Sequence, residues 1–518
     1  MRPPCDEAII RTGPVEAPCA AKTRSWILAA TILGSSMAFI DSTVVSVALP
    51  AIQASFHATV VDVQWVVESY GLFLGALILV GGSLGDLFGR RLIFVVGVAI
   101  FAVASLACGI AANIHHLIIA RSIQGIGAAL LVPGSLAIIS TSFGEKNRGR
   151  AIGTWSGFTA ITTAVGPVLG GWLVEHASWR WAFFINLPIA AVVIAISLWQ
   201  IPESRSAITA RVDWVGAFLA TLGLGGLVNG FLESLNLGWG NPLVFGSLIV
   251  AFGCLIALVF VEARVASPMV PLTLFKSRSF SGANLLTLFL YAAIGIFFFL
   301  FPLNLIQVQG YSATAAGAAM LPLILLMFLL SRWAGGLVAR YGPRSPLTIG
   351  PLIAAVGLVL FALPSVGSSY WKSFFPALVV LGFGMTLTVA PLTTVVMNSV
   401  DQDRVGTASG INNAVARVAS VLAIAVLGIV MVKAFGSRLN NSLDYLSLPP
   451  GMLQKLQSEE IRLAGLQVPA ALDTATRFAI KEMIGDAFAF GFRIVMFICA
   501  GLSVTSAAVA RLMIPKRT

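Results

Sequence analysis

Five ionisable side chains lie inside long apolar stretches of this sequence, where water is scarce: Asp41, Glu68, Arg121, Arg417 and Arg493. An ionised side chain at the centre of a membrane helix costs ~2.5 to 3.5 kcal/mol on insertion scales, so these residues are candidates for function. Burial disfavours an ionised carboxylate, whereas a nearby arginine favours it. An acid in contact with an arginine could therefore bind and release a proton. Arg417 and Arg493 lack a clear acid partner in the sequence, which leaves a substrate-binding or gating role open.

Asp41, Glu68 and Arg121 are expected at a similar depth, in one layer of neighbouring helices. A helix rises 1.5 Å per residue, which puts Asp41 roughly 12 Å below the outer end of its helix near Pro50. The next helix returns and brings Glu68 to a comparable depth. A purely structural salt bridge would also explain Asp41 and Arg121, and Glu68 could instead face a hydrated outer vestibule.

The composition indicates an all-α polytopic membrane protein. Of the 518 residues, 58% are hydrophobic and 10% are charged, against roughly 25% charged residues in a soluble domain. Fourteen apolar runs can cross ~30 Å of hydrocarbon as helices, and their lack of alternation excludes a β-barrel. Their centres lie near residues 37, 72, 102, 128, 163, 191, 222, 252, 292, 324, 355, 385, 418 and 498.

Basic residues are spread unevenly between the two sides of the membrane. If the N-terminus is cytoplasmic, the tails and inner connections hold 20 Lys and Arg, and the short outer loops hold two. This bias predicts cytoplasmic tails at 1–25 and 512–518. The formal net charge of +11 then follows from topology and from contact with anionic lipid. No nucleic-acid partner is expected.

Neither a metal site nor an enzyme active site is indicated. The five cysteines lack a CxxC spacing, and the four histidines lack metal-ligand spacing. No nucleophile and base occur at a suitable spacing, so we expect no enzymatic activity. The GxxxxGK[ST] loop of ATP-binding proteins is also missing from the sequence. The predicted energy source is therefore an ion gradient, without a cofactor.

The connection between the second and third runs reads GSLGDLFGRR. Its glycines let two helices approach and turn, and its acid lies within reach of two arginines. Such a charge network could act as a latch between two conformations, although turn chemistry and inner positive charge would also explain it. The candidate latch residues are Gly82, Gly85, Asp86, Gly89, Arg90 and Arg91.

The same loop recurs as GGLVARYGPR at residues 335–344, with Ala339 in place of the acid, and RGRAIGTW is echoed by RVGTASGI at 404–411. Duplicated six-helix units are typical of transporters, whose site lies near the midplane between the halves. We therefore predict two pseudo-symmetric bundles with two additional helices between them. Their ranges are 26–201, 213–262 and 280–511, the last including an outer loop at 434–485.

These motifs resemble those of the major facilitator superfamily, and more narrowly its fourteen-helix branch of drug:proton antiporters. GSLGDLFGRR resembles the signature after helix 2, and LIIARSIQGIGAA is similar to the helix 4 signature with its intramembrane arginine, here Arg121. AVGPVLGG is similar to the helix 5 signature of exporters, although Thr162 stands where a glycine is expected. FIDSTVVSVALP, WRWAFFINLP and PMVPLTLFKSRSF are similar to further segments of this branch, so the resemblance covers about residues 25–511.

The resemblance implies a major facilitator fold and a proton-coupled antiporter that exports lipophilic, often cationic, drugs by alternating access. Asp41 would take a proton from outside and release it inside, with Arg121 and Glu68 beside it. Helix 5 would seal the cavity against ion leak, or simply pack closely, because Pro167 bends it and small residues line it. The small and bending residues of helix 5 are Gly153, Gly157, Gly166, Pro167, Gly170 and Gly171.

The expected partners are a small lipophilic substrate, protons and the lipid bilayer, and we expect the location to be a bacterial cytoplasmic membrane. Protons are preferred to sodium only because of the resemblance, and a periplasmic adaptor is left open. A dedicated exporter of one metabolite or antibiotic would carry the same motifs. A nonconducting sensor or scaffold is an alternative of a different class. Residues 453–466 could form an amphipathic helix that docks on the cavity mouth or on a partner.

Overall fold

The computed structural model is helical and contains no strand over the residues it describes, which are 21–143, 145–205, 213–265, 268–400, 405–444, 446, 450–466, 468 and 472–516. Within that part of the chain, thirteen helices are long and apolar enough to cross a membrane. The remaining predicted run, centred near residue 163, coincides with the 32-residue helix α6. The prediction of an all-α polytopic membrane protein is confirmed.

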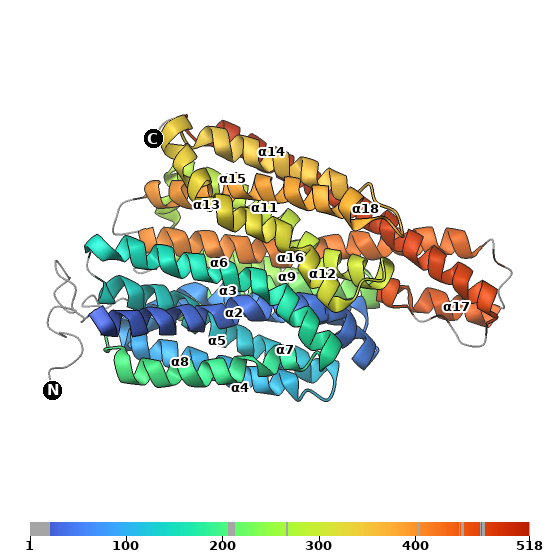
Figure 1. The fold of residues 1–518 in the computed structure, drawn as a ribbon, viewed down its shortest axis with the longest axis horizontal. Helices are drawn as coiled ribbons and strands as arrows, with labels where there is room; N and C mark the ends of the chain where they lie inside the picture. The colour runs from blue at the N-terminus through green and yellow to red at the C-terminus, as the bar shows by residue number, and fades with distance from the viewer. Residues whose placement is uncertain are drawn as a thin grey trace.

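The N-terminal bundle fills the lower half of the view in Figure 1. Its first helix begins at Ala21 rather than after the predicted tail of 1–25, of which residues 1–20 lie outside the described part. The helices of this bundle are α2 (Ala21–Phe56), α3 (Val60–Phe88), α4 (Arg90–Gly109), α5 (Ile114–Ser142), α6 (Glu145–His176), α7 (Trp181–Phe184) and α8 (Asn186–Gln200).

The C-terminal bundle lies above it in the same view. Several of its membrane segments are made of two consecutive helical pieces, as where α11 continues into a π-helical turn, η2. The elements of this bundle are α11 (Arg278–Leu303), η2 (Asn304–Val308), α12 (Ala313–Ala319), α13 (Leu321–Tyr341), α14 (Arg344–Phe361), η3 (Tyr370–Phe374), α15 (Phe375–Asn398), α16 (Val405–Leu443) and α18 (Thr474–Met513).

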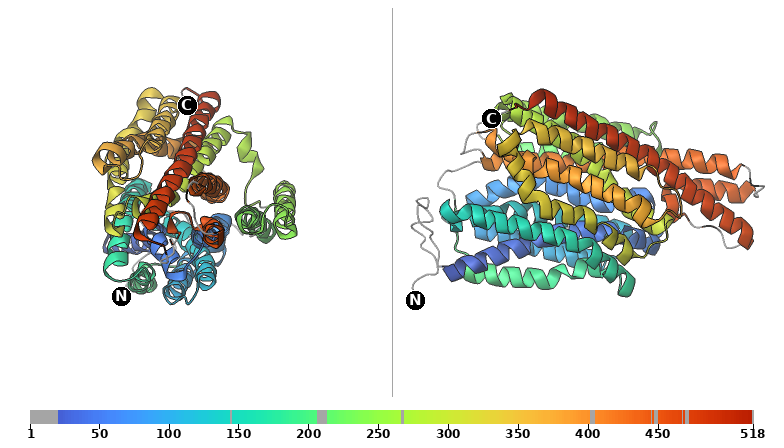
Figure 2. Two further views of the ribbon diagram at one scale, coloured as in Figure 1. Left: turned by 90° about the vertical axis from the view of Figure 1, so that its right-hand side faces the viewer. Right: turned by 45° about the horizontal axis from the view of Figure 1, so that its top comes forward.

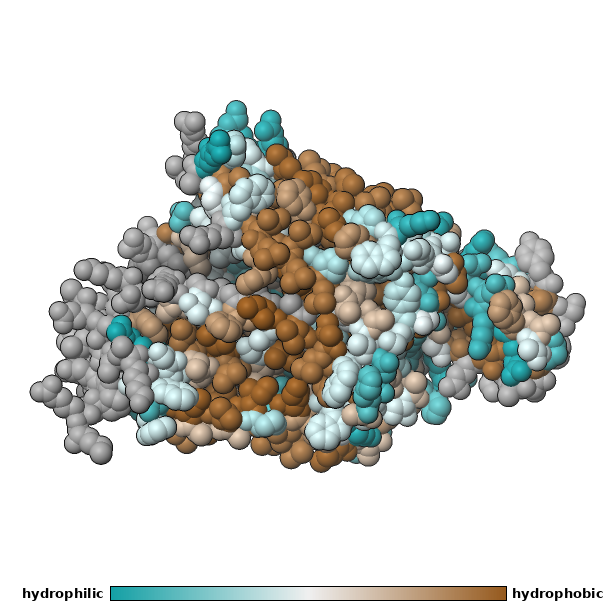
Figure 3. All heavy atoms as spheres, in the orientation of Figure 1, coloured by the Kyte–Doolittle hydropathy of each residue, from teal (hydrophilic) through white to brown (hydrophobic). Residues whose placement is uncertain are grey.

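Two further helices, α9 (Trp214–Leu237) and α10 (Pro242–Glu262), stand at the side of the molecule, as the end-on view in Figure 2 shows. α9 packs against both α3 and α16, whereas α10 packs against α9. The exposed face of α10 is apolar, as expected of a helix in contact with lipid. Figure 3 shows apolar side chains across the middle of one face and hydrophilic ones towards both ends.

The start of α2 and the end of α18 lie at one end of the molecule, here named the terminal end, and α17 (Pro450–Ser458) lies at the opposite end, the cap end (Figure 1). The expected loop at 434–485 is largely helical, because α16 continues to Leu443 and α18 begins at Thr474. The amphipathic helix expected at 453–466 is also interrupted. It consists of α17, which ends at Ser458, and a 3-10 turn, η5 (Glu460–Gly465), within which Leu463 has φ +51° and a buried side chain.

The two bundles share an apolar core that includes residues of the cap end. There, buried residues of α2 and α3 such as Leu49 and Val63 join one cluster with Phe297 and Met431 of the C-terminal bundle. At the terminal end, the buried residues of the N-terminal bundle form a separate cluster around Phe94. The structure is therefore closed at the cap end.

Candidate functional site

Asp41 and Arg121 form an ion pair in the interior of the N-terminal bundle. Asp41 lies on α2 and Arg121 on α5, and the Arg121 Nη1 atom donates to Asp41 Oδ2. The two side chains are 0% and 1% exposed. Each charge is thus kept in the apolar interior by the other, because an isolated buried ion would lose its hydration without compensation.

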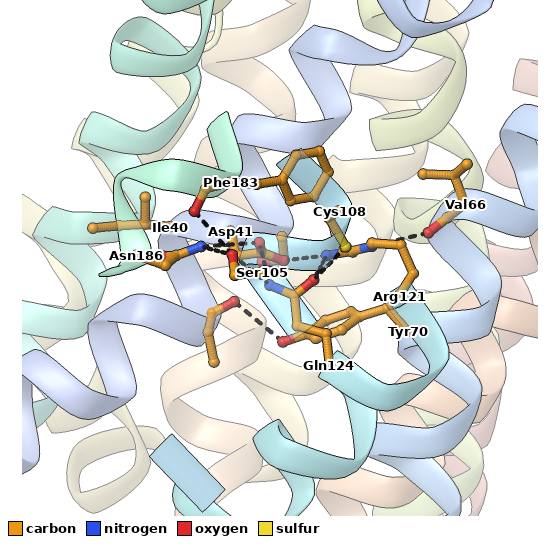
Figure 4. A network of polar contacts seen from close by, with 12 residues as sticks. Ile40, Asp41, Val66, Tyr70, Ser105, Cys108, Arg121, Gln124, Phe183 and Asn186 are labelled. Carbon is orange, nitrogen blue, oxygen red and sulfur yellow. Dashed lines mark hydrogen bonds and ion pairs between the residues drawn. The ribbon is translucent and has the colours of Figure 1, made fainter. Parts of the chain in front are cut away.

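Amide and hydroxyl side chains from neighbouring helices complete this ion pair, as Figure 4 shows. Gln124 Nε2 donates to Asp41 Oδ1 at 2.8 Å, while Gln124 Oε1 accepts from Arg121 Nη1 at 2.7 Å. Asn186 Nδ2 approaches Asp41 Oδ1 at 3.3 Å and donates to Ser105 Oγ at 2.9 Å. The carboxylate is therefore oriented by donors from α5 and α8 as well as by the arginine.

The guanidinium of Arg121 is also held from α3. Its Nε atom donates to the Val66 carbonyl at 3.1 Å, and its Cζ atom lies 4.3 Å from the centroid of the Tyr70 ring. An aromatic face attracts a cation and excludes water. The Tyr70 hydroxyl approaches the Ala38 carbonyl of α2 at 3.4 Å. The site therefore joins α2, α3, α4, α5 and α8, and a change in its charge would act on all of them.

The sequence identified the two charged members of this site but none of their neutral partners. Gln124 follows Arg121 by three positions, so the helical period puts both side chains on one face of α5. That spacing could have predicted Gln124. Ser105 and Asn186 come from segments far away in the chain, and only the packing of α8 against α2 and of α4 against α5 and α8 brings them to Asp41.

Glu68 lies on α3 outside this network and at the contact between the two bundles. Its side chain is 0% exposed, and among the described residues neither carboxylate oxygen has a hydrogen-bond partner. The same face of α3 touches α16, since Gln64 Nε2 donates to the Ile424 carbonyl at 3.1 Å and Gly71 lies against Val421. The vestibule expected for Glu68 is therefore not seen in this closed arrangement.

Arg417 and Arg493 occupy different surroundings. Arg493 on α18 donates from Nε to the Ala362 carbonyl at 2.8 Å, which satisfies a backbone acceptor at the end of α14. Arg417 lies on α16 opposite Gly75 of α3, is partly exposed, and has no ion-pair or hydrogen-bond partner in the described part of the chain.

The candidate latch is a charge network at the terminal end of the N-terminal bundle. Asp86 pairs with Arg90 at 2.7 Å. Arg91 approaches Glu203, which follows α8, at 3.7 Å. The Glu203 carboxylate also accepts from the backbone amides of Arg91 and Leu92, both at 3.1 Å, and so caps the start of α4. Glu203 was not predicted from the sequence, because it is distant in the chain from Arg91. The ion pairs described here do not cross to the other bundle.

The glycines of the latch loop permit close helix contact. Gly89 has φ +121°, a conformation that disfavours other residues. Gly82 approaches Pro133 of α5, and Gly85 lies beside the backbone of Arg90. These contacts keep the loop compact against α4 and α5.

The described glycines of α6 contact two other helices, α2 and α12. Gly166 and Gly170 contact Thr43 and Val44 of α2, within one turn of Asp41. Gly171 contacts the backbone of Ala313 in α12 of the other bundle, where Gly317 meets the carbonyl of Pro167 in return. α6 therefore connects α2, the helix that carries Asp41, to the closed cap end. The surroundings of Gly153 and Gly157 lie outside the described part of the structure.

Comparisons with known proteins identify a single family. The Major Facilitator Superfamily model matches residues 31–424. Multidrug resistance protein Stp of Mycobacterium tuberculosis is 36% identical over 430 residues, which cover 82% of this chain and 79% of Stp. The tetracenomycin C resistance and export protein of Streptomyces glaucescens is 32% identical over 498 residues, or 94% of this chain and 91% of that protein.

Solved structures agree at the level of the fold. A bacterial homologue of the human lysosomal transporter Spinster, in an inward-facing and unoccupied conformation, superposes with a TM-score of 0.65 at 18% identity. The match covers 96% of this chain and 99% of that one.

Proposed function

Since this chain belongs to the major facilitator superfamily, a family of membrane transporters and not of enzymes, we propose that it is a proton-coupled antiporter that exports lipophilic compounds. Relatives named for multidrug resistance and for export of tetracenomycin C support export. In this proposal the terminal end faces the cytoplasm and the cap end faces outward, in a bacterial cytoplasmic membrane. The closed cap end then corresponds to an inward-facing state.

The buried ion pair of Asp41 and Arg121 is the observation that carries the proposal. A proton on Asp41 would remove its charge and leave Arg121 held by Gln124, Tyr70 and the Val66 carbonyl. Breaking a buried pair in this way changes the local free energy by about 3–5 kcal/mol, which is enough to shift a two-state equilibrium strongly. In an electrogenic exchange, each inward proton gains about 2.3 kcal/mol per 100 mV.

Three other features would convert this change into alternating access. Glu68 would act as a second proton site, because it lies at the contact of α3 with α16, which must rearrange when the bundles rock. The loop of Asp86, Arg90 and Arg91 would latch to the other bundle in the outward-open state. α6 would seal the cap end through Gly171. Arg417 and Arg493 are the further candidates for substrate binding or gating.

The test is transport by purified protein in liposomes with an imposed proton gradient, with and without sodium, and a panel of lipophilic neutral and cationic compounds. We expect proton-driven movement that Asp41→Asn abolishes. Asp444→Asn is the matched control, since Asp444 is exposed at the cap end and should leave transport unchanged. Undiminished transport by a normally inserted Asp41→Asn variant would remove Asp41 from the mechanism.

A dedicated exporter of one compound is the second candidate, favoured by the relative that matches 94% of this chain and is named for a single antibiotic. A narrow substrate profile in the same panel would select it. A sensor or scaffold would move no compound at all. Co-purification would reveal a periplasmic adaptor.

A further inference from the structure

The charged groups of the membrane interior are not all balanced by one another. Asp41 and Arg121 cancel as an ion pair, and Arg493 is bound to a backbone carbonyl. Arg417 has no such partner within the described residues, although a charged side chain in a membrane helix normally pairs or faces a functional cavity. Its guanidinium is therefore available to bind a ligand.

The position of Arg417 suits contact with a transported compound. It lies on α16 where that helix meets α3, since a side chain at Gly75 would meet the Arg417 Cβ atom at 3.2 Å. Arg417 thus stands between the two bundles, at the contact of α16 with α3.

A polar row on α16 leads to Arg417 from the terminal end. Ser409, Asn413 and Arg417 follow one another at intervals of four residues, so they share one face of the helix. Asn413 is exposed and the other two are partly exposed, whereas Val421 and Ile424 beyond them are buried. The accessible row therefore ends near Arg417, about midway along the membrane segment.

An unpaired guanidinium in an apolar region favours a ligand that restores its hydrogen bonds. Carboxylates and ionised phenols accept from its fork of N–H donors in charge-assisted bonds. We infer that Arg417 binds an acidic oxygen of the exported compound, so that the substrates include lipophilic aromatic acids and phenols. This inference rests on the proposed export function and names the substrate class that the interior charge selects.

The experiment uses one aromatic scaffold in three forms, a free carboxylic acid, its methyl ester and a cationic dimethylaminoethyl amide. Binding to purified protein is measured by thermal shift and transport is measured in liposomes. We expect Arg417→Gln to weaken binding and raise the KM of the acid roughly tenfold or more, as loss of a charge-assisted hydrogen bond implies. The ester and the amide should change little, and Arg417→Lys should restore part of the affinity for the acid.

Lys433→Gln is the matched control, because it removes one positive charge from an exposed position of the same helix. It should leave the preference among the three forms unchanged. Equal losses for all three forms in Arg417→Gln would indicate a gating role and overturn the inference, as would an acid that does not bind the wild-type protein. Binding of the acid that depends on Arg417, without proton-driven transport, would uphold this site and reject the proposed antiport.

Discussion

The carboxylate of Asp41 and the guanidinium of Arg121, 80 residues apart in the chain, form an ion pair that neither water nor lipid reaches. Gln124 bonds to both members of the pair, so the charged groups and the amide form one unit. A change in any of the three should therefore be felt by the other two.

Removing one charge of this pair should destabilise the protein more than removing both. We expect Asp41→Asn and Arg121→Met each to lower stability by about 3–5 kcal/mol, because each leaves an uncompensated buried group. The double variant should lose less than the sum, which a double-mutant cycle of unfolding in detergent would measure. Strictly additive losses would mean that the two residues do not interact.

Gln124→Leu should weaken the site without changing its formal charge. The substitution deletes the bonds to Asp41 and Arg121 and leaves their atoms buried, which should cost about 1.5–3 kcal/mol. Lower thermal stability together with slower proton-driven export is the expected result. Gln200→Leu, at the end of α8, serves as a control for loss of an amide. Full stability of the Gln124 variant would argue against the network.

Glu203→Ala should loosen the start of α4. The Glu203 carboxylate accepts from two backbone amides there and approaches Arg91 at 3.7 Å. Loss of a helix cap costs about 0.5–2 kcal/mol, so hydrogen exchange should rise at residues 90–93. Glu482→Ala, at an exposed position of α18, should leave exchange there unchanged. Unaltered protection in Glu203→Ala would show that the cap contributes nothing.

Gly171→Val should keep the cap end from closing. Gly171 packs on the backbone of Ala313, so a larger side chain would separate α6 from α12. We expect increased labelling of a cysteine placed at Thr314, together with slow transport. Gly253→Val is the control, since Gly253 has no neighbour within 4 Å. Labelling at the wild-type level would show that this contact does not close the molecule.

Docking of η5 should depend on pH through Glu460. Burial raises the pKa of the Glu460 carboxyl above its ordinary 4.5, against a bond from Asn440 that lowers it. The docked state therefore favours the protonated carboxyl group of Glu460. The stabilisation of docking that results is complete below about pH 4.5 and is lost as the pH rises through the raised pKa.

Hydrogen exchange of residues 461–466, corrected for its intrinsic pH dependence, measures this effect. Protection should fall as the pH rises, and Glu460→Gln should make it nearly independent of pH. The other charges of the segment, Glu459 and Arg462, pair with each other at 3.2 Å and remain in the variant. The same fall in Glu460→Gln would assign the dependence to another group.

Much of the fold was predictable because few backbone structures are stable inside a membrane. Apolar runs of about 20 residues must form helices, since lipid cannot satisfy backbone hydrogen bonds. The cap segment was less predictable. Residues 453–466 carry an amphipathic pattern, yet α17 ends at Ser458 and Leu463, further along, has φ +51° and a side chain buried at the cap end.

By itself, the sequence determined which residues need a partner or a function, because burying a charge in an apolar membrane helix is costly wherever the helix lies. It therefore identified Asp41, Glu68, Arg121 and Arg417. Their pairing was decided only by the tertiary structure. Packing of five segments joined Asp41 to Arg121, buried Glu68 between the bundles and left Arg417 without a described partner. Contacts between residues so far apart in the chain depend on how the helices pack, and local sequence patterns do not predict that packing.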